Sequence, residues 1–165
     1  MKIIFTIIIL LSSLFGVELE FNKTYEGGLK LSAPRLGAHF YLPPNWNGKI
    51  EKGQVFFMQH NKGLGYISAQ RANINTVVSE MMKEQSVDNG LVLEVKGKMK
   101  KITRSLYRIN YSASGGYLDY QGISYIVIGP QNRVIRLFSV FKKKDYTLMD
   151  NTLMRFAHSI SFTSI

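Results

Sequence analysis

Polar and apolar residues alternate along several short segments of the chain, which is the pattern of β-strands with one buried face. The stretch 38–42 places Phe40 and Leu42 on one face and is followed by two prolines. Because proline has no N–H to donate to a strand ladder, we expect this strand to end in a turn. The runs 54–60 and 64–70 are rich in β-prone residues and are joined by Asn-Lys-Gly, which predicts a hairpin.

Four more strands are expected in the second half of the chain. Residues 91–95 and 106–113 alternate between apolar and polar positions, so each presents one face to a core. Residues 123–128 and 134–141 are almost continuously apolar, as in central strands that are covered on both faces. The turn-forming residues 129–132 join these two strands. Such short connections predict an antiparallel meander.

After residue 73 the hydrophobic period changes to that of a helix. The positions i, i+3, i+4, i+7 and i+8 are occupied by Ile74, Val77, Val78, Met81 and Met82, which is one stripe of an amphipathic helix. Asn73 and Asn75 are the candidates for its N-cap. The dipeptide Asn89-Gly90 is expected to end it.

A second helical stripe lies near the end of the sequence. It consists of Met149, Leu153, Phe156, Ala157 and Ile160. The pattern Thr147-x-x-Asp150 resembles a capping box just ahead of it. Two helices and about seven strands, without the strand-helix alternation that builds parallel sheets, predict an α+β fold in which the helices pack against an antiparallel sheet.

The first 34 residues differ in character from the rest. Lys2 precedes an apolar run over 3–11, and a short stretch with two serines leads to Gly16, which is the layout of a secretory signal peptide over residues 1–16. We expect cleavage near Gly16, with an uncleaved N-terminal membrane anchor as the alternative. Residues 17–34 contain two adjacent glycines and little periodicity, and we interpret them as a flexible leader to a single α+β domain over 35–165.

The composition limits both the stabilising chemistry and the partners. The absence of cysteine excludes disulfides, thiolate metal ligands and cysteine nucleophiles, so the domain must be stabilised by its core. The formal net charge is +10, which favours anionic partners. Because the expected export takes the protein out of the cytoplasm, membrane head groups, anionic glycans and acidic proteins are better candidates than nucleic acid. A basic protein without a specific anionic partner is the alternative.

Much of the positive charge lies in two clusters. The first contains Lys96, Lys98, Lys100, Lys101 and Arg104, and the second contains Lys142, Lys143 and Lys144. If both clusters lie in exposed loops, they are candidates for binding one anionic partner, including a membrane surface. The alternative is a solvated hairpin and a basic loop. Tyr41 and Trp46, beside the proline turn, are candidates for an aromatic contact, with core packing as the alternative.

No catalytic constellation is recognisable in the sequence. His39, His60 and His158 have no second ligand at i+3 or i+4, so we assign no metal site. Residues 112–116, Ser-Ala-Ser-Gly-Gly, lack the first glycine of a nucleophile elbow and follow a strand into an expected turn. We therefore assign no catalytic residue and no cofactor, and we expect the protein not to be an enzyme.

The predicted order of elements, together with Phe-x-Leu-Pro-Pro-x-Trp at 40–46 and Ile-x-Phe at 160–162, resembles the PsbP-like superfamily. This superfamily includes the photosystem II extrinsic protein, a Ran-binding nuclear import factor and many exported bacterial proteins. The resemblance covers 38–162 and implies a small α/β/α sandwich that binds or stabilises other proteins without catalysis. Asn45 stands where such chains often have glycine, and no functional residue of the superfamily has a matching position here.

Taken together, the patterns predict an exported, non-catalytic binding or accessory protein of the cell envelope, periplasmic or secreted. A hydrolase acting on an envelope polymer, and an inhibitor or immunity-type protein for a secreted enzyme, are the alternatives. The segment Glu-Phe-Asn-Lys-Thr at 20–24 is also similar to the longer acceptor sequence of bacterial N-glycosylation systems, so Asn22 is a candidate glycosylation site.

Overall fold

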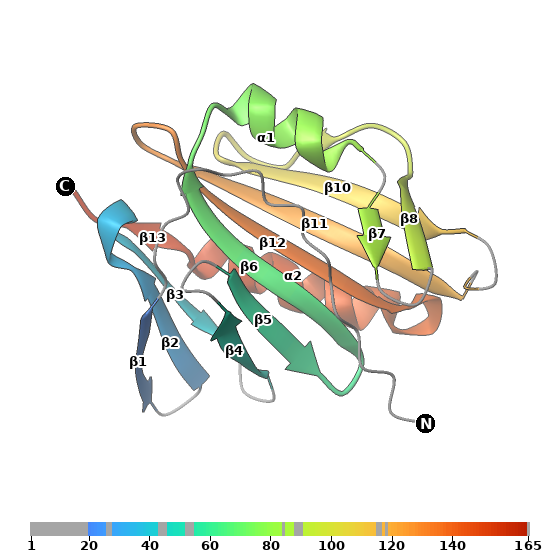
Figure 1. Cartoon of the computed structure of the whole chain (residues 1–165), viewed down its shortest axis with the longest axis horizontal. Helices are drawn as coiled ribbons and strands as arrows, with labels where there is room; N and C mark the ends of the chain where they lie inside the picture. Colours follow the sequence, from blue (N-terminus) through green and yellow to red (C-terminus); the bar gives the residue numbers. More distant parts are fainter. Residues whose placement is uncertain are drawn as a thin grey trace.

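Figure 1 shows the computed structural model of the chain, which describes residues 20–25, 28–42, 46–51, 55–83, 85–87, 91–114, 117 and 119–164. Its elements, in chain order, are β1 (Glu20–Tyr25), β2 (Gly28–Ala33), η1 (Pro34–Leu36), β3 (Ala38–Leu42), β4 (Asn47–Glu51), β5 (Val55–His60), β6 (Gly63–Arg71), α1 (Ile74–Met81), β7 (Gln85–Val87), β8 (Leu91–Val95), β9 (Lys100–Lys101), β10 (Leu106–Ala113), β11 (Tyr120–Gly129), β12 (Arg133–Lys142), η4 (Lys143–Asp145), α2 (Tyr146–Ser159) and β13 (Ser161–Phe162).

These strands form two antiparallel sheets. The larger sheet has nine strands: eight lie in the order β4-β5-β6-β12-β11-β10-β8-β7, and β9 pairs with β10 off this path. The smaller sheet has four strands in the order β1-β2-β3-β13, so β13 returns to lie beside β3. The predicted α+β fold with an antiparallel sheet is therefore confirmed.

The two helices lie on opposite faces of the larger sheet (Figure 1). Helix α2 packs against β11 and β12 and also contacts β3 of the smaller sheet, whereas α1 covers the other face. Because side chains alternate along a strand, successive residues of β12 enter different cores. Ile135 and Leu137 join the core under α2, and Val134 and Phe138 join the core under α1. Burial on both faces explains why this strand reads as a continuous apolar run.

Most of the predicted strands are present. The stretch 38–42 is β3, in which Phe40 and Leu42 are fully buried, and the predicted hairpin is β5 paired with β6. Strands β8, β10, β11 and β12 are neighbours in the larger sheet, as the expected meander requires. In the turn between β11 and β12, Gln131 and Asn132 have positive φ angles of 57° and 59°, which the two central residues of a type I′ turn adopt.

The interpretation of residues 17–34 as a flexible leader is wrong for β1 and β2, which occupy Glu20–Tyr25 and Gly28–Ala33. Strand β2 pairs with both β1 and β3, and Leu31 and Ala33 on it are fully buried in the core under α2. The smaller sheet therefore includes β1 and β2 from the expected leader. These two strands are additional to the seven expected. The predicted signal peptide lies outside the described residues.

Helix α1 starts where the sequence predicts but ends earlier. Asn73 is its N-cap, and the side-chain oxygen Oδ1 accepts a hydrogen bond of 2.8 Å from the backbone N–H of Asn75. The helix ends at Met81, and β7 follows at residues 85–87, so the expected end at Asn89-Gly90 is wrong.

Helix α2 begins one residue before the predicted capping box. Its first residue is Tyr146, because the chain passes from β12 through the short 3₁₀ turn η4. Thr147 and Asp150 consequently both lie inside the helix, and Asp145 precedes it without a side-chain capping bond. The capping-box prediction is wrong, and the carboxylate of Asp150 is free to reach the sheet instead.

A buried arginine joins three distant segments near the turn between β11 and β12. Arg133 Nε donates to the carbonyl of Pro130 at 2.8 Å, and Nη1 donates to the carbonyls of Leu36 and Thr163, each at 2.8 Å. The guanidinium carbon lies 5.2 Å from the centre of the Phe162 ring. With 3% of Arg133 exposed, this side chain fastens η1 and the β13 end of the chain to the larger sheet.

Candidate functional site

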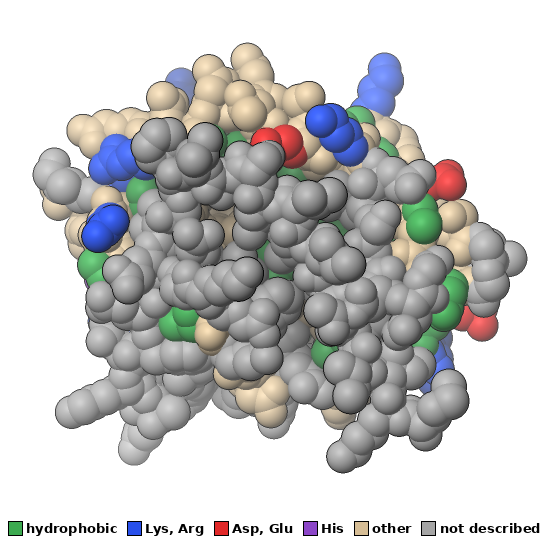
Figure 2. All heavy atoms as spheres, viewed as in Figure 1, with side chains coloured by type: hydrophobic (Ala, Val, Ile, Leu, Met, Phe, Trp, Pro, Cys, Tyr) green, Lys and Arg blue, Asp and Glu red, His purple; other side chains and the backbone are tan. Residues whose placement is uncertain are grey.

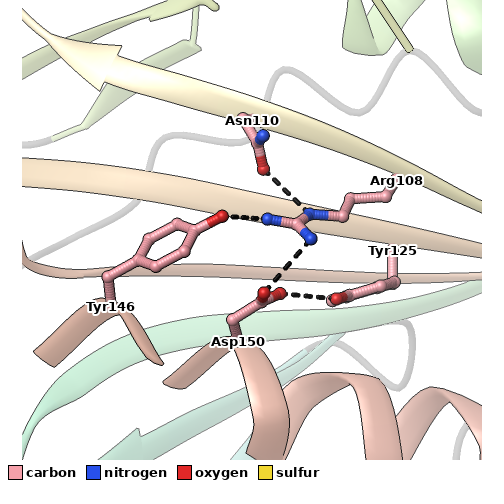
Figure 3. A network of polar contacts seen from close by, with 5 residues as sticks. All are labelled: Arg108, Asn110, Tyr125, Tyr146 and Asp150. Atoms are coloured by element: carbon pink, nitrogen blue, oxygen red, sulfur yellow. Dashed lines mark hydrogen bonds and ion pairs between the residues drawn. The ribbon is translucent and has the colours of Figure 1, made fainter. Parts of the chain in front are cut away.

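A polar network lies beneath the start of α2, and Figure 3 shows its five side chains. Arg108 Nε donates to Asn110 Oδ1 at 3.0 Å, and a terminal guanidinium nitrogen donates to the hydroxyl of Tyr146. The other terminal nitrogen pairs with a carboxylate oxygen of Asp150 at 3.1 Å. The second carboxylate oxygen accepts a hydrogen bond of 2.6 Å from the hydroxyl of Tyr125.

Strand register explains why these groups meet. Arg108 on β10 stands directly opposite Tyr125 on β11, so both side chains project from the same face toward α2. The side chains of Arg108 and Asp150 are only 14% and 15% exposed. Within the network, all three guanidinium nitrogens and both carboxylate oxygens are engaged, so this site fastens α2 to the sheet and presents no uncommitted acid or base.

On the opposite face of the sheet, an aromatic cluster holds α1. The hydroxyl of Tyr111 donates to the carbonyl of Met81 in the last turn of α1, at 2.8 Å. The ring of Phe138 lies between Tyr66 and Tyr111, with ring centres 5.1 Å and 5.6 Å apart. The guanidinium of Arg136 lies 5.0 Å from the centre of the Tyr66 ring. Apolar contact and a cation–π interaction therefore hold this face together.

The buried tyrosines give the protein an expected sensitivity to alkali. Burial raises the pKa of Tyr66, Tyr111 and Tyr125 above the usual value of 10.0, and the hydrogen bond to Asp150 adds to the effect for Tyr125. In the unfolded chain these hydroxyls ionise near pH 10, while in the folded chain they keep their protons. The free energy of unfolding is therefore fully present below about pH 10 and falls as the pH rises further.

Urea unfolding at increasing pH, together with phenolate absorbance, tests this expectation. We expect the native protein to ionise fewer than its nine tyrosines until it unfolds, and the denatured protein to ionise all nine together. Tyr111→Phe should reduce the loss of stability above pH 10. Full ionisation near pH 10 with the fold intact would contradict the prediction.

The structure places both basic clusters on the surface. Lys96, Lys98, Lys100, Lys101 and Arg104 are all exposed, and so are Lys142, Lys143 and Lys144. None of these eight cations forms an ion pair with a carboxylate in the part of the chain that the structure describes. Lys101 lies with its Nζ 5.8 Å from the centre of the Tyr107 ring. Both clusters are thus accessible to an anionic partner.

The two clusters do not form one patch. Lys101 stands opposite Tyr107, which stands opposite Ile126 on β11, whereas Lys142 stands opposite Tyr120. These two positions on β11 are six residues apart (126 minus 120), which is about 20 Å along a strand. The clusters therefore lie toward opposite ends of the sheet, so one anionic partner would have to extend over about 20 Å to contact both.

The two aromatic candidates have different environments. Trp46 is 7% exposed and belongs to the core under α2. The alternative of core packing therefore applies to Trp46. Tyr41 on β3 is half-buried, and the Nζ of Lys30 lies 5.9 Å from the centre of its ring. An aromatic binding pair formed by these two side chains is therefore not available.

Among the described residues, no group of three or more histidine, aspartate or glutamate side chains could hold a metal ion. His39 lies on β3 and His158 near the end of α2, where it is exposed. Ser112 is part of β10 and Ser114 directly follows that strand, whereas the glycines after them lie outside the described residues.

Asn22 lies on β1, opposite Lys30 on β2, and the strand register shifts between Asn22 and Thr24. This irregularity coincides with the acceptor segment at 20–24. Glycosylation at Asn22 stays a prediction, which the intact mass of the protein from its native source would test.

Within the described part of the chain, we find no helix with both the length and the apolar character needed to span a bilayer.

Comparison with known proteins identifies the fold. No family model matches the chain, and neither does any curated protein sequence. Among solved structures, the chain is similar to the solution structure of cyanobacterial PsbP (CyanoP) from Synechocystis sp. PCC 6803, with a TM-score of 0.56 over 93% of this chain and 99% of that chain. The chain has a PsbP-like fold. The sequence identity is 12%, so the similarity confirms the resemblance at the level of the fold.

The described apolar residues of the motif that carried the resemblance are packing residues of this chain. Phe40, Leu42 and Trp46 are buried in the core under α2, and Ile160 and Phe162 pack against the same core. Because these residues pack the core, they give no information about a ligand.

Proposed function

We propose that this protein is an exported, non-catalytic binding or accessory protein of the cell envelope that holds an anionic partner through its exposed lysine and arginine side chains. Export rests on the signal-peptide pattern over residues 1–16. The accessory role is in keeping with a PsbP-like fold, which the chain shares with cyanobacterial PsbP (CyanoP) at 12% sequence identity.

One observation carries this proposal. The eight cations of the two basic clusters all stay exposed, and within the described residues none of them is neutralised by a carboxylate. The groups that are buried and charged, such as Arg108 with Asp150 and Arg133, are instead committed to holding the fold. The charge on the surface is thus available for a partner, and clusters of like charge strengthen attraction to an oppositely charged surface.

A pull-down from an envelope extract tests the proposal. We expect the immobilised protein to retain a partner at low ionic strength and to release it as salt is added, because exposed charges are screened beyond about 8–10 Å in physiological salt. The matched control replaces the eight clustered cations with glutamine. Because these eight side chains are exposed, the glutamine variant should fold normally but no longer retain the partner. The proposal would be overturned if the amount of retained partner were the same at high salt and in the glutamine variant, or if no partner were retained at all.

A further inference from the structure

The first basic cluster is built onto the edge of the larger sheet. We call residues 96–105 the basic edge; it contains five cations and no aspartate or glutamate. Its backbone is fixed to β10, because the N–H of Lys96 donates to the carbonyl of Asn110 at 2.8 Å and the N–H of Ile102 donates to the carbonyl of Leu106 at 2.9 Å. The cations are therefore presented by an ordered segment along one strand.

Strand geometry determines how a partner can reach these cations. Lys100 stands opposite Arg108, and Lys101 stands opposite Tyr107, so the two lysines project toward different faces of the sheet. A partner that lies flat on either face would reach only one of them. A partner that meets both must approach the sheet edge-on, which suits an extended and roughly planar surface.

Exposed apolar side chains accompany the basic edge. Ile102 within it and Met82 at the end of α1 are each 39% exposed. The end of α1 lies near the start of the basic edge, because the hydroxyl of Tyr111 bonds to the carbonyl of Met81 while its backbone pairs with Val95. Ile102 lies further along β10, opposite Leu106, about 17 Å from Tyr111. Figure 1 shows α1 lying above β10, and Figure 2, in the same view, shows Lys and Arg side chains scattered over the upper half of the molecule.

Acidic residues nearby do not cancel the charge. The described carboxylates on the two neighbouring elements are Glu80 on α1 and Glu94 on β8, both exposed. The five cations of the basic edge exceed these two described carboxylates by three charges. Each lysine or arginine close to an anionic membrane contributes about 1 kcal/mol, so an excess of this size is sufficient for weak, reversible attachment.

We infer that the basic edge docks on an anionic phospholipid surface, with its cations among the lipid phosphates and with Ile102 and Met82 entering the head-group layer. This inference rests on the proposed function and names the partner. A bilayer is favoured over an acidic protein or glycan because the site is edge-on, and because exposed apolar side chains beside cations are the composition of interfacial membrane contacts. The second cluster, at the other end of the sheet, lies away from this contact.

Sedimentation with lipid vesicles tests the inference. At low ionic strength we expect the protein to bind vesicles that contain both phosphatidylglycerol and phosphatidylcholine. We expect no binding to vesicles of phosphatidylcholine alone. Substituting Lys98→Glu, Lys100→Glu and Lys101→Glu together should lower the partition coefficient more than about 100-fold. The matched control carries the same change of charge at the other cluster: Lys142→Glu, Lys143→Glu and Lys144→Glu. Equal losses in the two variants would show attraction by net charge alone and would overturn the inference.

The absence of cysteine permits a direct test of depth. An environment-sensitive fluorophore attached to Ile102→Cys should shift its emission to the blue on phosphatidylglycerol vesicles. The control label is Asn61→Cys, an exposed position in the β5–β6 turn, and its emission should not shift. Replacing Ile102 with serine should weaken binding about five- to tenfold. An unshifted label at position 102 on bound protein would also overturn the inference.

Failure of this inference and failure of the proposed function can be told apart. Retention of an envelope protein or glycan in the pull-down, without binding to vesicles, would remove the membrane contact and leave the binding role standing. An absence of binding in both experiments would remove both.

Discussion

Replacing Arg133 with methionine is expected to lower the free energy of unfolding by about 3–5 kcal/mol. Methionine keeps much of the apolar stem but removes every donor. The carbonyls of Leu36 and Thr163 then lose the bonds of 2.8 Å that the guanidinium supplied, and the Nε bond to Pro130 is lost as well. Because the side chain is 3% exposed, water cannot easily replace these donors. Urea unfolding followed by circular dichroism measures the loss.

Arg133→Lys is the control for the charge. A lysine ammonium has no planar fork, so it should reach only some of the three carbonyls and recover part of the stability. Limited proteolysis provides a second measurement if the methionine variant does not fold, because cleavage of the lysine variant should begin near β13. A methionine variant as stable as the parent, within about 0.5 kcal/mol, would show that the arginine does not fasten these segments.

Removing the carboxylate of Asp150 is expected to cost about 2–4 kcal/mol, somewhat less than for a fully buried pair because 15% of the side chain is exposed. In Asp150→Ala, the cation of Arg108 loses its counter-charge and the hydroxyl of Tyr125 loses its acceptor. Helix α2 should then detach more easily from β10 and β11. Hydrogen exchange of the α2 amides, together with urea unfolding, measures both effects.

A double-mutant cycle separates the ion pair from its surroundings. Arg108→Met should also destabilise the protein, but the double variant should be less destabilised than the sum of the two, since neither charge is left unpaired. Tyr125→Phe is the milder control, with an expected loss of about 1 kcal/mol for a single hydrogen bond. Strict additivity of Asp150→Ala and Arg108→Met would contradict the direct pairing that Figure 3 shows.

The strands that hydrophobic patterns predicted are those whose neighbours lie close in the sequence. Strands β10, β11 and β12 are joined by short connections, so alternation and turn residues define them locally. Strand β2 was missed although Leu31 and Ala33 alternate with polar residues, because the glycines at 27 and 28 favoured a loop. Strand β13, which pairs with β3 at the edge of the smaller sheet, contributes only two residues and is set by tertiary packing.

The site residues divide in the same way. The exposure of the basic clusters follows from composition, because runs of lysine are rarely buried. The roles of Arg108, Arg133 and Asp150 could not be predicted, since each depends on partners brought together from distant parts of the chain. Asp150 illustrates the ambiguity: an acidic residue three positions after a threonine fits both a capping box and a helix interior, and only the position of the first helical turn decides between them.

Binding of the purified protein to native envelope membranes, measured across a range of ionic strength, tests the central claim most directly. The exposed cations predict firm binding at low ionic strength, a steep decrease as salt is added, and no binding by the variant that carries glutamine at all eight clustered positions. Binding that is equally strong in high salt and in that variant, or no binding even at low ionic strength, would contradict the claim that this PsbP-like protein works by holding an anionic partner.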